Sequence, residues 1–292
     1  MKKLLFSKIF DIISLLRITQ WPKNIFVFVP LVFSKNLFDE SQFNKSFLAF
    51  IVFSISSSLV YVINDLFDKK RDSNHPTKKH RPIASGRISN LFVITIIGIL
   101  FLLLLFVQNY VTREFLIIIS VYIGINIFYS MGLKQVVILD ILFIAAGFML
   151  RVIGGAYVIN VSVSSWLILS TLFLSLFLAV IKRKTELLLL TDSSREVLSD
   201  YSIEFIKQIT AISAAGIIIC YSLYTVSDRT INEFGTENLV FTTIFVVFGV
   251  FRYMFISEKK FLGENIIEAI YRDYPSIINI MLYLITIYFI IY

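Results

Sequence analysis

Apolar residues fill most of this chain in runs long enough to cross a lipid bilayer. A search for runs that can cover about 30 Å of hydrocarbon finds about nine. The first run is the weakest, because it is short and contains Pro30. We therefore predict an all-α fold, a polytopic membrane bundle of about nine transmembrane helices. The predicted spans cover residues 24–38, 46–66, 90–109, 113–131, 138–158, 164–182, 208–228, 239–257 and 275–292.

The polar segments between the runs predict one transmembrane domain over residues 1–292. No linker or change of composition divides the chain, and the loops on one side are short. Residues 1–23 are predicted to be an amphipathic N-terminal segment, because Asp11 interrupts the apolar run that a signal peptide would need. The loops on the other side are longer and charged, and cover residues 67–89, 183–207 and 257–274.

Basic residues are divided unevenly between the two sides that the nine spans define. Of the 27 Lys and Arg residues, 22 fall on the side of the N-terminus and four on the other. The positive-inside rule then predicts a cytoplasmic N-terminus and cytoplasmic long loops, in a bacterial-type inner membrane. The net charge of +7 is attributed mainly to this topology and to anionic lipid, with a smaller share for phosphates. No soluble module is present to bind nucleic acid, and the single Cys220 excludes a cysteine metal site.

Three carboxylates and an amide gather at the inner end of the second predicted span. On a helix that continued through them, at about 100° per residue, all four side chains would share one face. Mg²⁺ prefers oxygen ligands and leaves positions for substrate phosphates, so we predict a magnesium site that handles a diphosphate. The alternative is a solvated helix end, whose carboxylates pair with the basic residues 69–71. The predicted metal ligands are Asn64, Asp65, Asp68 and Asp72, and the three aspartates are also the predicted catalytic residues.

A basic turn follows the acidic cluster about ten residues later. In the segment from Arg81 to Arg87, Pro and Gly fix a turn and the two arginines can bind phosphate oxygens. Taken with the spans, NDxxDxxxD followed by RPxxxG resembles the UbiA-type intramembrane prenyltransferase superfamily. This resemblance implies a UbiA-like helical fold and a diphosphate held through Mg²⁺ on the first motif.

Polar residues around the fifth span form a second candidate wall. The segment YSxGLK, with Tyr129 and Lys134, leads to Asp140, and Arg151 follows eleven residues later. That spacing places Asp140 and Arg151 on one helix face within roughly 20°, some 16 Å apart along the axis. A buried arginine below an acid predicts one wall of an anion-binding cavity. The alternative is an arginine bound by helix carbonyls or by a neighbouring acid for packing alone.

The sixth span ends in the motif KRKxE, which contains Lys182, Arg183 and Glu186. Members of the superfamily that use a prenyl diphosphate donor usually carry a second acidic motif, DxxxD, in this loop. This chain lacks it, which favours a lipid partner that brings a bare phosphate. The alternative is a set of positive-inside flank residues that extend to the lipid surface.

Together with the segment from Arg17 to Asn24, these motifs resemble the decaprenyl-phosphate phosphoribosyltransferase branch of the superfamily, most densely between Arg17 and Glu186. The resemblance implies transfer of a 5-phosphoribosyl group from phosphoribosyl diphosphate to a polyprenyl phosphate, with release of diphosphate and with Mg²⁺ as cofactor. The predicted substrate-binding residues are Lys23, Asn24, Arg81, Tyr129, Lys134, Asp140, Arg151, Lys182, Arg183 and Glu186.

The residue types fit this reaction, and two other functions stay open. A phosphate monoester is already anionic at neutral pH, so it needs no general base, and we assign no catalytic role to His75 or His80. The first alternative is prenyl transfer from a prenyl diphosphate to an aromatic or other small acceptor, against which the missing DxxxD argues. The second is a transporter or a scaffold, against which acids at the cytoplasmic end rather than at the midplane argue.

Overall fold

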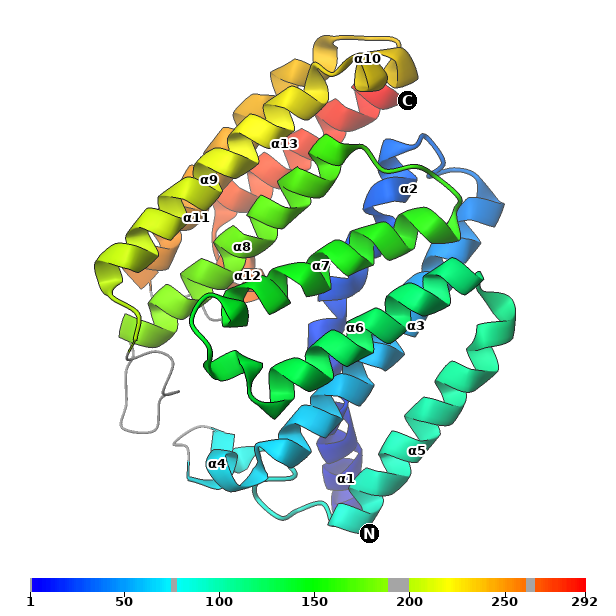
Figure 1. Cartoon of the computed structure of the whole chain (residues 1–292), viewed down its shortest axis with the longest axis vertical. Helices are drawn as coiled ribbons and strands as arrows, with labels where there is room; N and C mark the ends of the chain where they lie inside the picture. Colours follow the sequence, from blue (N-terminus) through cyan, green and yellow to red (C-terminus); the bar gives the residue numbers. More distant parts are fainter. Residues whose placement is uncertain (1, 75–77, 189–199, 261–265) are drawn as a thin grey trace. The chain divides into compact units, whose positions relative to one another are not determined.

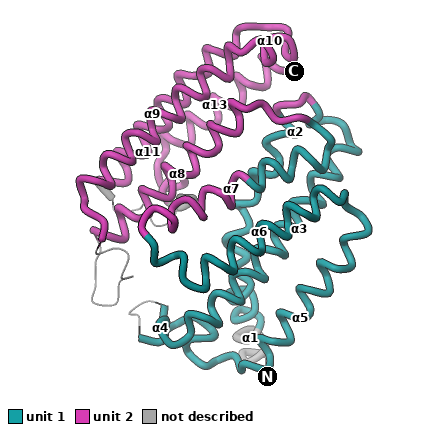
Figure 2. The backbone as a smooth tube through the Cα atoms, in the orientation of Figure 1, with its two compact units in different colours: residues 1–32, 36–136, 150–161 teal, residues 33–35, 137–149, 162–292 magenta. Residues whose placement is uncertain are grey.

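A computed structural model of the chain describes every residue except 1, 75–77, 189–199 and 261–265. The described part is built of helices and contains no strand, which confirms the predicted all-α fold (Figure 1). Two compact units divide the chain, and each is described by itself (Figure 2). The first comprises Met1–Val32, Asn36–Val136 and Leu150–Val161, and the second comprises Phe33–Lys35, Val137–Met149 and Ser162–Tyr292. One domain over the whole chain stays a prediction.

The first unit is organised around the long helix α3, against which η1, α5 and α6 pack. At its centre, the ring of Phe53 meets the rings of Phe115 and Tyr122 edge-on, at centroid distances of 5.7 and 5.5 Å. Buried serines on α3 let η1 lie close, because small side chains allow backbones to approach; Ser54 accepts from Asn24 and Ser58 from Trp21, each at 3.0 Å. The unit contains α1 (Lys2–Leu15), the 3-10 helix η1 (Ile18–Phe28), most of α2 (Val29–Phe33), α3 (Glu40–Phe67), α4 (Lys69–Ser73), η2 (Lys78–His80), α5 (Asn90–Val107), η3 (Gln108–Tyr110), α6 (Arg113–Met131), η4 (Leu133–Gln135) and the second half of α7 (Leu139–Val158).

Gly155 on α7 lies against the backbone of η1. A Cβ atom at this position would stand 2.0 Å from the carbonyl oxygen of Val27. Because a backbone atom cannot rotate away, we expect Gly155→Ala to destabilise the protein by about 1–3 kcal/mol, as overpacking does. Thermal unfolding in detergent measures the effect. Gly124→Ala on α6 is the matched control, since a Cβ there meets nothing within 4 Å. Equal melting temperatures of the two variants would contradict the close approach of Gly155 to η1.

The second unit is built on α8 and α9, which lie side by side in Figure 1. Their contact depends on Gly216, where a Cβ would stand 2.4 Å from the ring of Phe173. Tyr221 and Thr242 share a buried hydrogen bond of 2.6 Å between their hydroxyls, and Tyr283 donates to Tyr221 at 3.1 Å. The elements are the first half of α7, α8 (Ser165–Leu188), α9 (Ile203–Thr225), α10 (Asp228–Phe234), η6 (Asn238–Thr242), α11 (Thr243–Lys260), α12 (Ile266–Tyr271) and α13 (Tyr274–Ile291).

Eight helices of the described part, not nine, are long and apolar enough to cross a membrane. The missing one is the predicted span 24–38, which the structure divides between η1 and the short α2. Pro22 lies inside η1 and Pro30 near the start of α2, and a proline removes a backbone donor from a helix. The eight candidate spans are Glu40–Phe67, Asn90–Tyr110, Arg113–Met131, Leu139–Val158, Ser165–Leu188, Ile203–Thr225, Asn238–Glu258 and Tyr274–Ile291.

Several predicted loop boundaries need correction. The predicted loop 183–207 begins too early, because α8 continues to Leu188 and carries the whole KRKxE motif on helix. Lys, Arg and Glu are good helix formers, and the Arg183–Glu186 pair has helical spacing, so the charges extend the helix rather than end it. The loop 67–89 contains α4 and η2, and the loop 257–274 contains the end of α11 and α12. The N-terminal segment 1–23 holds α1 and then the first turns of η1.

Candidate active site

The acidic end of α3 is not one continuous helix. α3 ends at Phe67 and α4 begins at Lys69, with Asp68 between them at φ −85° and ψ 1°. The prediction assumed one continuous helix through Asp72, and the structure interrupts it at Asp68; Asp65 and Asp72 still lie close enough to share Nη1 of Arg81. The carboxylates bind cations that come from different segments of the chain.

Two arginines converge on the buried carboxylate of Asp65. Arg17 donates to its Oδ1 and lies 4.9 Å above the ring of Tyr61. Arg81 approaches the same oxygen at 3.1 Å and reaches Oδ2 of Asp72 at 2.6 Å. The backbone of Arg17 is left-handed, with φ 49°, a conformation that costs free energy in a residue other than glycine. Arg17 is a candidate site residue that our sequence prediction missed, although it opens the quoted N-terminal motif.

The other members of the acidic cluster, Asp68 and Asn64, are bound by Lys134. This buried lysine lies on η4, and its Nζ donates to both oxygens of Asp68, at 2.6 and 2.8 Å, and to Oδ1 of Asn64 at 3.4 Å. Three carboxylates are thus matched by three cations from outside the acidic segment. Among the described contacts, residues 69–71 do not pair with these carboxylates, which contradicts the solvated-end alternative.

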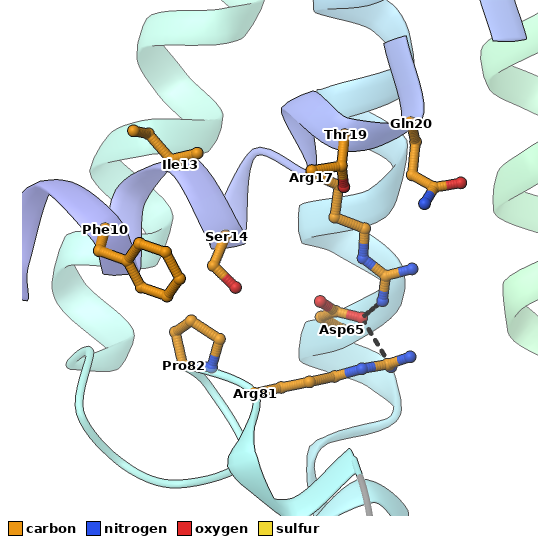
Figure 3. A pocket seen from close by; sticks show the side chains of 9 residues that line it. All are labelled: Phe10, Ile13, Ser14, Arg17, Thr19, Gln20, Asp65, Arg81 and Pro82. Atoms are coloured by element: carbon orange, nitrogen blue, oxygen red, sulfur yellow. Dashed lines mark hydrogen bonds and ion pairs between the residues drawn. The ribbon is translucent and has the colours of Figure 1, made fainter. Parts of the chain in front are cut away.

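A pocket of about 310 Å³ opens beside Asp65 in the first unit. Figure 3 shows Arg17 and Arg81 reaching Asp65 from opposite sides, with Phe10 and Pro82 facing each other nearby. Its walls come from α1, η1, the end of α3 and the turn that begins at Arg81. The lining residues are Phe10, Ile13, Ser14, Arg17, Thr19, Gln20, Asp65, Arg81 and Pro82.

Arg151 lies deeper in the first unit, on the second half of α7. Its Nε donates to Oδ1 of Asn24 at 2.6 Å, and its Nη2 donates to the hydroxyl of Tyr122 at 3.0 Å. The guanidinium also lies 4.9 Å above the ring of Tyr122. Asn24 is held in turn by its own donation to Ser54, at 3.0 Å. The structure thus brings together Arg151 and Asn24, two predicted site residues from distant parts of the sequence.

Lys23 precedes Asn24 on η1 and has a perturbed pKa. Burial, followed by the positive charges of Arg151 and Arg17, lowers its pKa from 10.5 to about 8. Within the described residues, Lys23 forms no hydrogen bond or ion pair through its side chain. An ammonium group near two guanidiniums and without a counter-charge of its own favours an anion, so this part of the first unit is suited to phosphate.

In the second unit, Arg183 and Asp140 form a fully buried ion pair, with side chains 0% exposed. Arg183 also donates to Glu186, one turn further along α8. The hydroxyl of Tyr201 donates to Asp140 at 2.7 Å and accepts the backbone N–H of Ile138 at 2.8 Å. Burial and this bond to Asp140 raise the pKa of Tyr201, which keeps its hydroxyl protonated. Ile138 needs such support, because its φ of 71° is unusual for a β-branched residue.

The remaining predicted residues occupy more open positions. Lys182 lies 4.0 Å from Glu186 and its side chain is 37% exposed, whereas Arg183 is enclosed by carboxylates. Tyr129 is half-buried near the end of α6. Asp140 and Arg151 share α7, but their partners described above belong to different units.

The donor atoms at the end of α3 suit a hard divalent cation. In the part of the chain that the structure describes, no three His, Cys, Asp or Glu side chains are placed to hold a metal together. Mg²⁺, however, is commonly held by one or two carboxylates, with water and substrate phosphates completing its shell. Asp65, Asp68 and Asn64 supply such oxygens, and all three are bound to cations that a phosphate could take in exchange.

Comparison with known proteins identifies the family of this chain. Residues 26–195 match the UbiA prenyltransferase family. The decaprenyl-phosphate phosphoribosyltransferase of Mycolicibacterium smegmatis is 33% identical over 232 residues, which cover 77% of this chain and 73% of the relative. The enzyme of the same name from Mycobacterium tuberculosis is 30% identical over 220 residues, 73% of each chain.

A solved structure gives the same fold. The UbiA homolog from Archaeoglobus fulgidus, bound to DMAPP and Mg²⁺, superposes with a TM-score of 0.71 at 15% identity, over 96% of this chain and 98% of that one. The eight long apolar helices and these relatives together show an integral membrane protein. The chain belongs to the UbiA prenyltransferase family and is a membrane-embedded transferase.

Proposed function

We propose that this protein transfers a 5-phosphoribosyl group from phosphoribosyl diphosphate to the phosphate of a polyprenyl lipid and releases diphosphate. The observation that carries the proposal is the likeness, over about three quarters of both chains, to relatives named decaprenyl-phosphate phosphoribosyltransferase. The basic KRKxE motif at the end of α8 supports it, because a second acidic clamp for a prenyl diphosphate is absent there.

The first unit would bind the donor. The anionic groups of the donor would bind the cations that pair with the carboxylates in this structure, namely Arg17, Arg81 and Lys134. Asp65 and Asp68, with Asn64 and Asp72 beside them, would hold Mg²⁺, which when bound neutralises the leaving diphosphate. The carboxylates would also stabilise positive charge that develops at the anomeric carbon. Cations and acids would thus exchange partners when the donor enters.

The acceptor needs positioning more than activation. A phosphate monoester is anionic at neutral pH, so its oxygen can attack without a general base. In the second unit, Lys182 is the proposed residue for the lipid phosphate, because its side chain is partly exposed. Arg183 would hold Glu186 and Asp140 in place beside it. We further propose that the protein lies in a bacterial-type inner membrane with these residues on the cytoplasmic side, as the distribution of basic residues predicts.

One assay separates the proposal from its main rival. The rival is prenyl transfer to an aromatic or other small acceptor, which the DMAPP bound to the Archaeoglobus homolog favours. Purified protein in detergent with Mg²⁺, phosphoribosyl diphosphate and polyprenyl phosphate should yield a phosphoribosylated lipid and free diphosphate. A parallel reaction receives a prenyl diphosphate and an aromatic acceptor. Turnover only in that second reaction would replace the proposal by its rival.

Lys182→Ala tests the acceptor site. We expect the apparent KM for polyprenyl phosphate to rise about tenfold, since an accessible ammonium that binds a phosphate contributes roughly 1.5 kcal/mol. The KM for the donor should stay unchanged. Lys45→Ala, which removes an exposed lysine near the start of α3, is the control. Unchanged KM values for both substrates would favour a lysine that only flanks the lipid.

A further inference from the structure

We infer that the pocket beside Asp65 is a subsite for a sugar phosphate, in which Arg17 and Arg81 bind the phosphate and Thr19 and Gln20 bind sugar hydroxyls. The inference rests on the proposed function and deepens it, because phosphoribosyl diphosphate carries a second phosphate at the far end of its ribose. None of the residues Ser14, Arg17, Thr19 and Gln20 is among those predicted to bind substrate.

The charged wall of the pocket is suited to a phosphate. Two guanidiniums, from Arg17 and Arg81, share the single Oδ1 of Asp65. The lining carries these two guanidiniums and the carboxylate of Asp65, and Arg81 also binds Asp72, which lies outside the lining, at 2.6 Å. Guanidinium groups bind phosphate oxygens through two parallel hydrogen bonds, and Figure 3 shows the two arginines converging on one point. A phosphate arriving there would meet both.

The neutral wall of the pocket is suited to hydroxyl groups. Ser14, Thr19 and Gln20 present two hydroxyls and an amide, and within the described residues none of these side chains has a hydrogen-bond partner. Each can donate and accept, as recognition of a ribose hydroxyl requires. Ser14 and Thr19 are exposed and Gln20 is half-buried, so their polar groups are open to an incoming ligand.

The size of the pocket agrees with a small polar ligand. A volume of about 310 Å³ stands at the lower end of the range for ligand pockets. This space accepts a pentose phosphate, whereas a polyprenyl chain is far too long for it. Phe10, Ile13 and Pro82 supply the apolar side, on which the carbon face of a sugar ring can rest.

The second group of cation and acids lies outside this pocket. Lys134, Asp68 and Asn64 form a cluster of their own, and none of them lines the pocket. A donor with anionic groups at both ends of a ribose requires two such places. The geometry therefore places the diphosphate of the donor at the Lys134 cluster and its sugar phosphate in the pocket.

Ribose 5-phosphate is the probe that tests the subsite directly. Radiolabelled ribose 5-phosphate is equilibrated by dialysis against the full chain in detergent, with ribose, inorganic phosphate or polyprenyl phosphate as competitors. We expect one saturable site that phosphoribosyl diphosphate displaces and that ribose alone and polyprenyl phosphate do not. Gln20→Leu, which keeps the volume but removes the amide, should weaken binding about tenfold. Gln108→Leu, at an exposed position of η3, should not.

Kinetics separate failure of the subsite from failure of the proposed function. Gln20→Leu should raise the KM for phosphoribosyl diphosphate about tenfold, with the KM for the lipid unchanged. Normal donor KM values in an active Gln20→Leu enzyme would overturn the subsite and leave the function standing. A shift in the lipid KM instead would assign the pocket to the lipid phosphate. If the wild-type protein lacks the transfer reaction but binds ribose 5-phosphate through Gln20, the function fails and the subsite stands.

Discussion

Asp65→Asn and Asp68→Asn should each reduce turnover by at least about 10²-fold while the protein stays folded. Each amide keeps the size of the carboxylate but removes the charge that would hold Mg²⁺. Asp65→Asn leaves Arg17 and Arg81 without their shared counter-charge, and Asp68→Asn leaves the buried Lys134 without its own. Initial rates of diphosphate release at saturating substrates measure the loss.

A matched variant separates this effect from a general loss of charge. Asp228→Asn removes a carboxylate at an exposed position at the start of α10 and should leave the rate unchanged. Melting temperatures show whether each variant is folded. Full activity in both Asp65→Asn and Asp68→Asn would exclude the metal site at the end of α3.

Arg183→Met should cause the largest loss of stability, about 3–5 kcal/mol, because it leaves a buried carboxylate without its cation. Asp140 is 0% exposed and would keep only the Tyr201 hydroxyl as a described side-chain partner. Thermal or denaturant unfolding in detergent gives the difference from the wild type. Arg113→Met, at an exposed position on α6, serves as the control.

The double variant Asp140→Asn/Arg183→Met tests the reason for that loss. Removing both charges leaves no uncompensated carboxylate at position 140, so part of the stability should return. If the two contributions were additive, the double variant would be less stable than Arg183→Met by the full loss of stability that Asp140→Asn causes alone. That result would contradict the coupling that a buried ion pair requires.

Much of the fold follows from hydrophobic runs, and the exceptions have physical causes. Eight of the nine predicted spans appear as long helices, because about 20 apolar residues in sequence leave the backbone no other way to satisfy its hydrogen bonds. The segment 24–38 differs because of its prolines. The helical end of α8 was missed because charge alone suggested a loop, whereas the Arg183–Glu186 pair stabilises the helix.

The candidate site was predictable in its residue types and less so in its pairings. Lys134 and the acids of α3 were predicted separately as phosphate and metal ligands, but their direct contact depends on tertiary structure. Arg17 was missed because an arginine ahead of an interfacial tryptophan has the pattern of a membrane anchor. Tyr201 was missed for a different reason: one tyrosine in a polar stretch carries no signal of the hydrogen bond that it makes with Asp140.

The four ion pairs at the end of α3 have a consequence for how the protein folds. Three of them join residues that stand 48, 16 and 66 positions apart in the sequence. Closing such long loops costs entropy before any contact is gained, so the last ion pair can form only after the segments around α3 have docked. A chain that lacks residues 1–23 would lose Arg17, and with it one of the three closures. During synthesis the acidic end of α3 leaves the ribosome before Lys134 does, and its carboxylates stay incompletely neutralised until the loop after α6 follows.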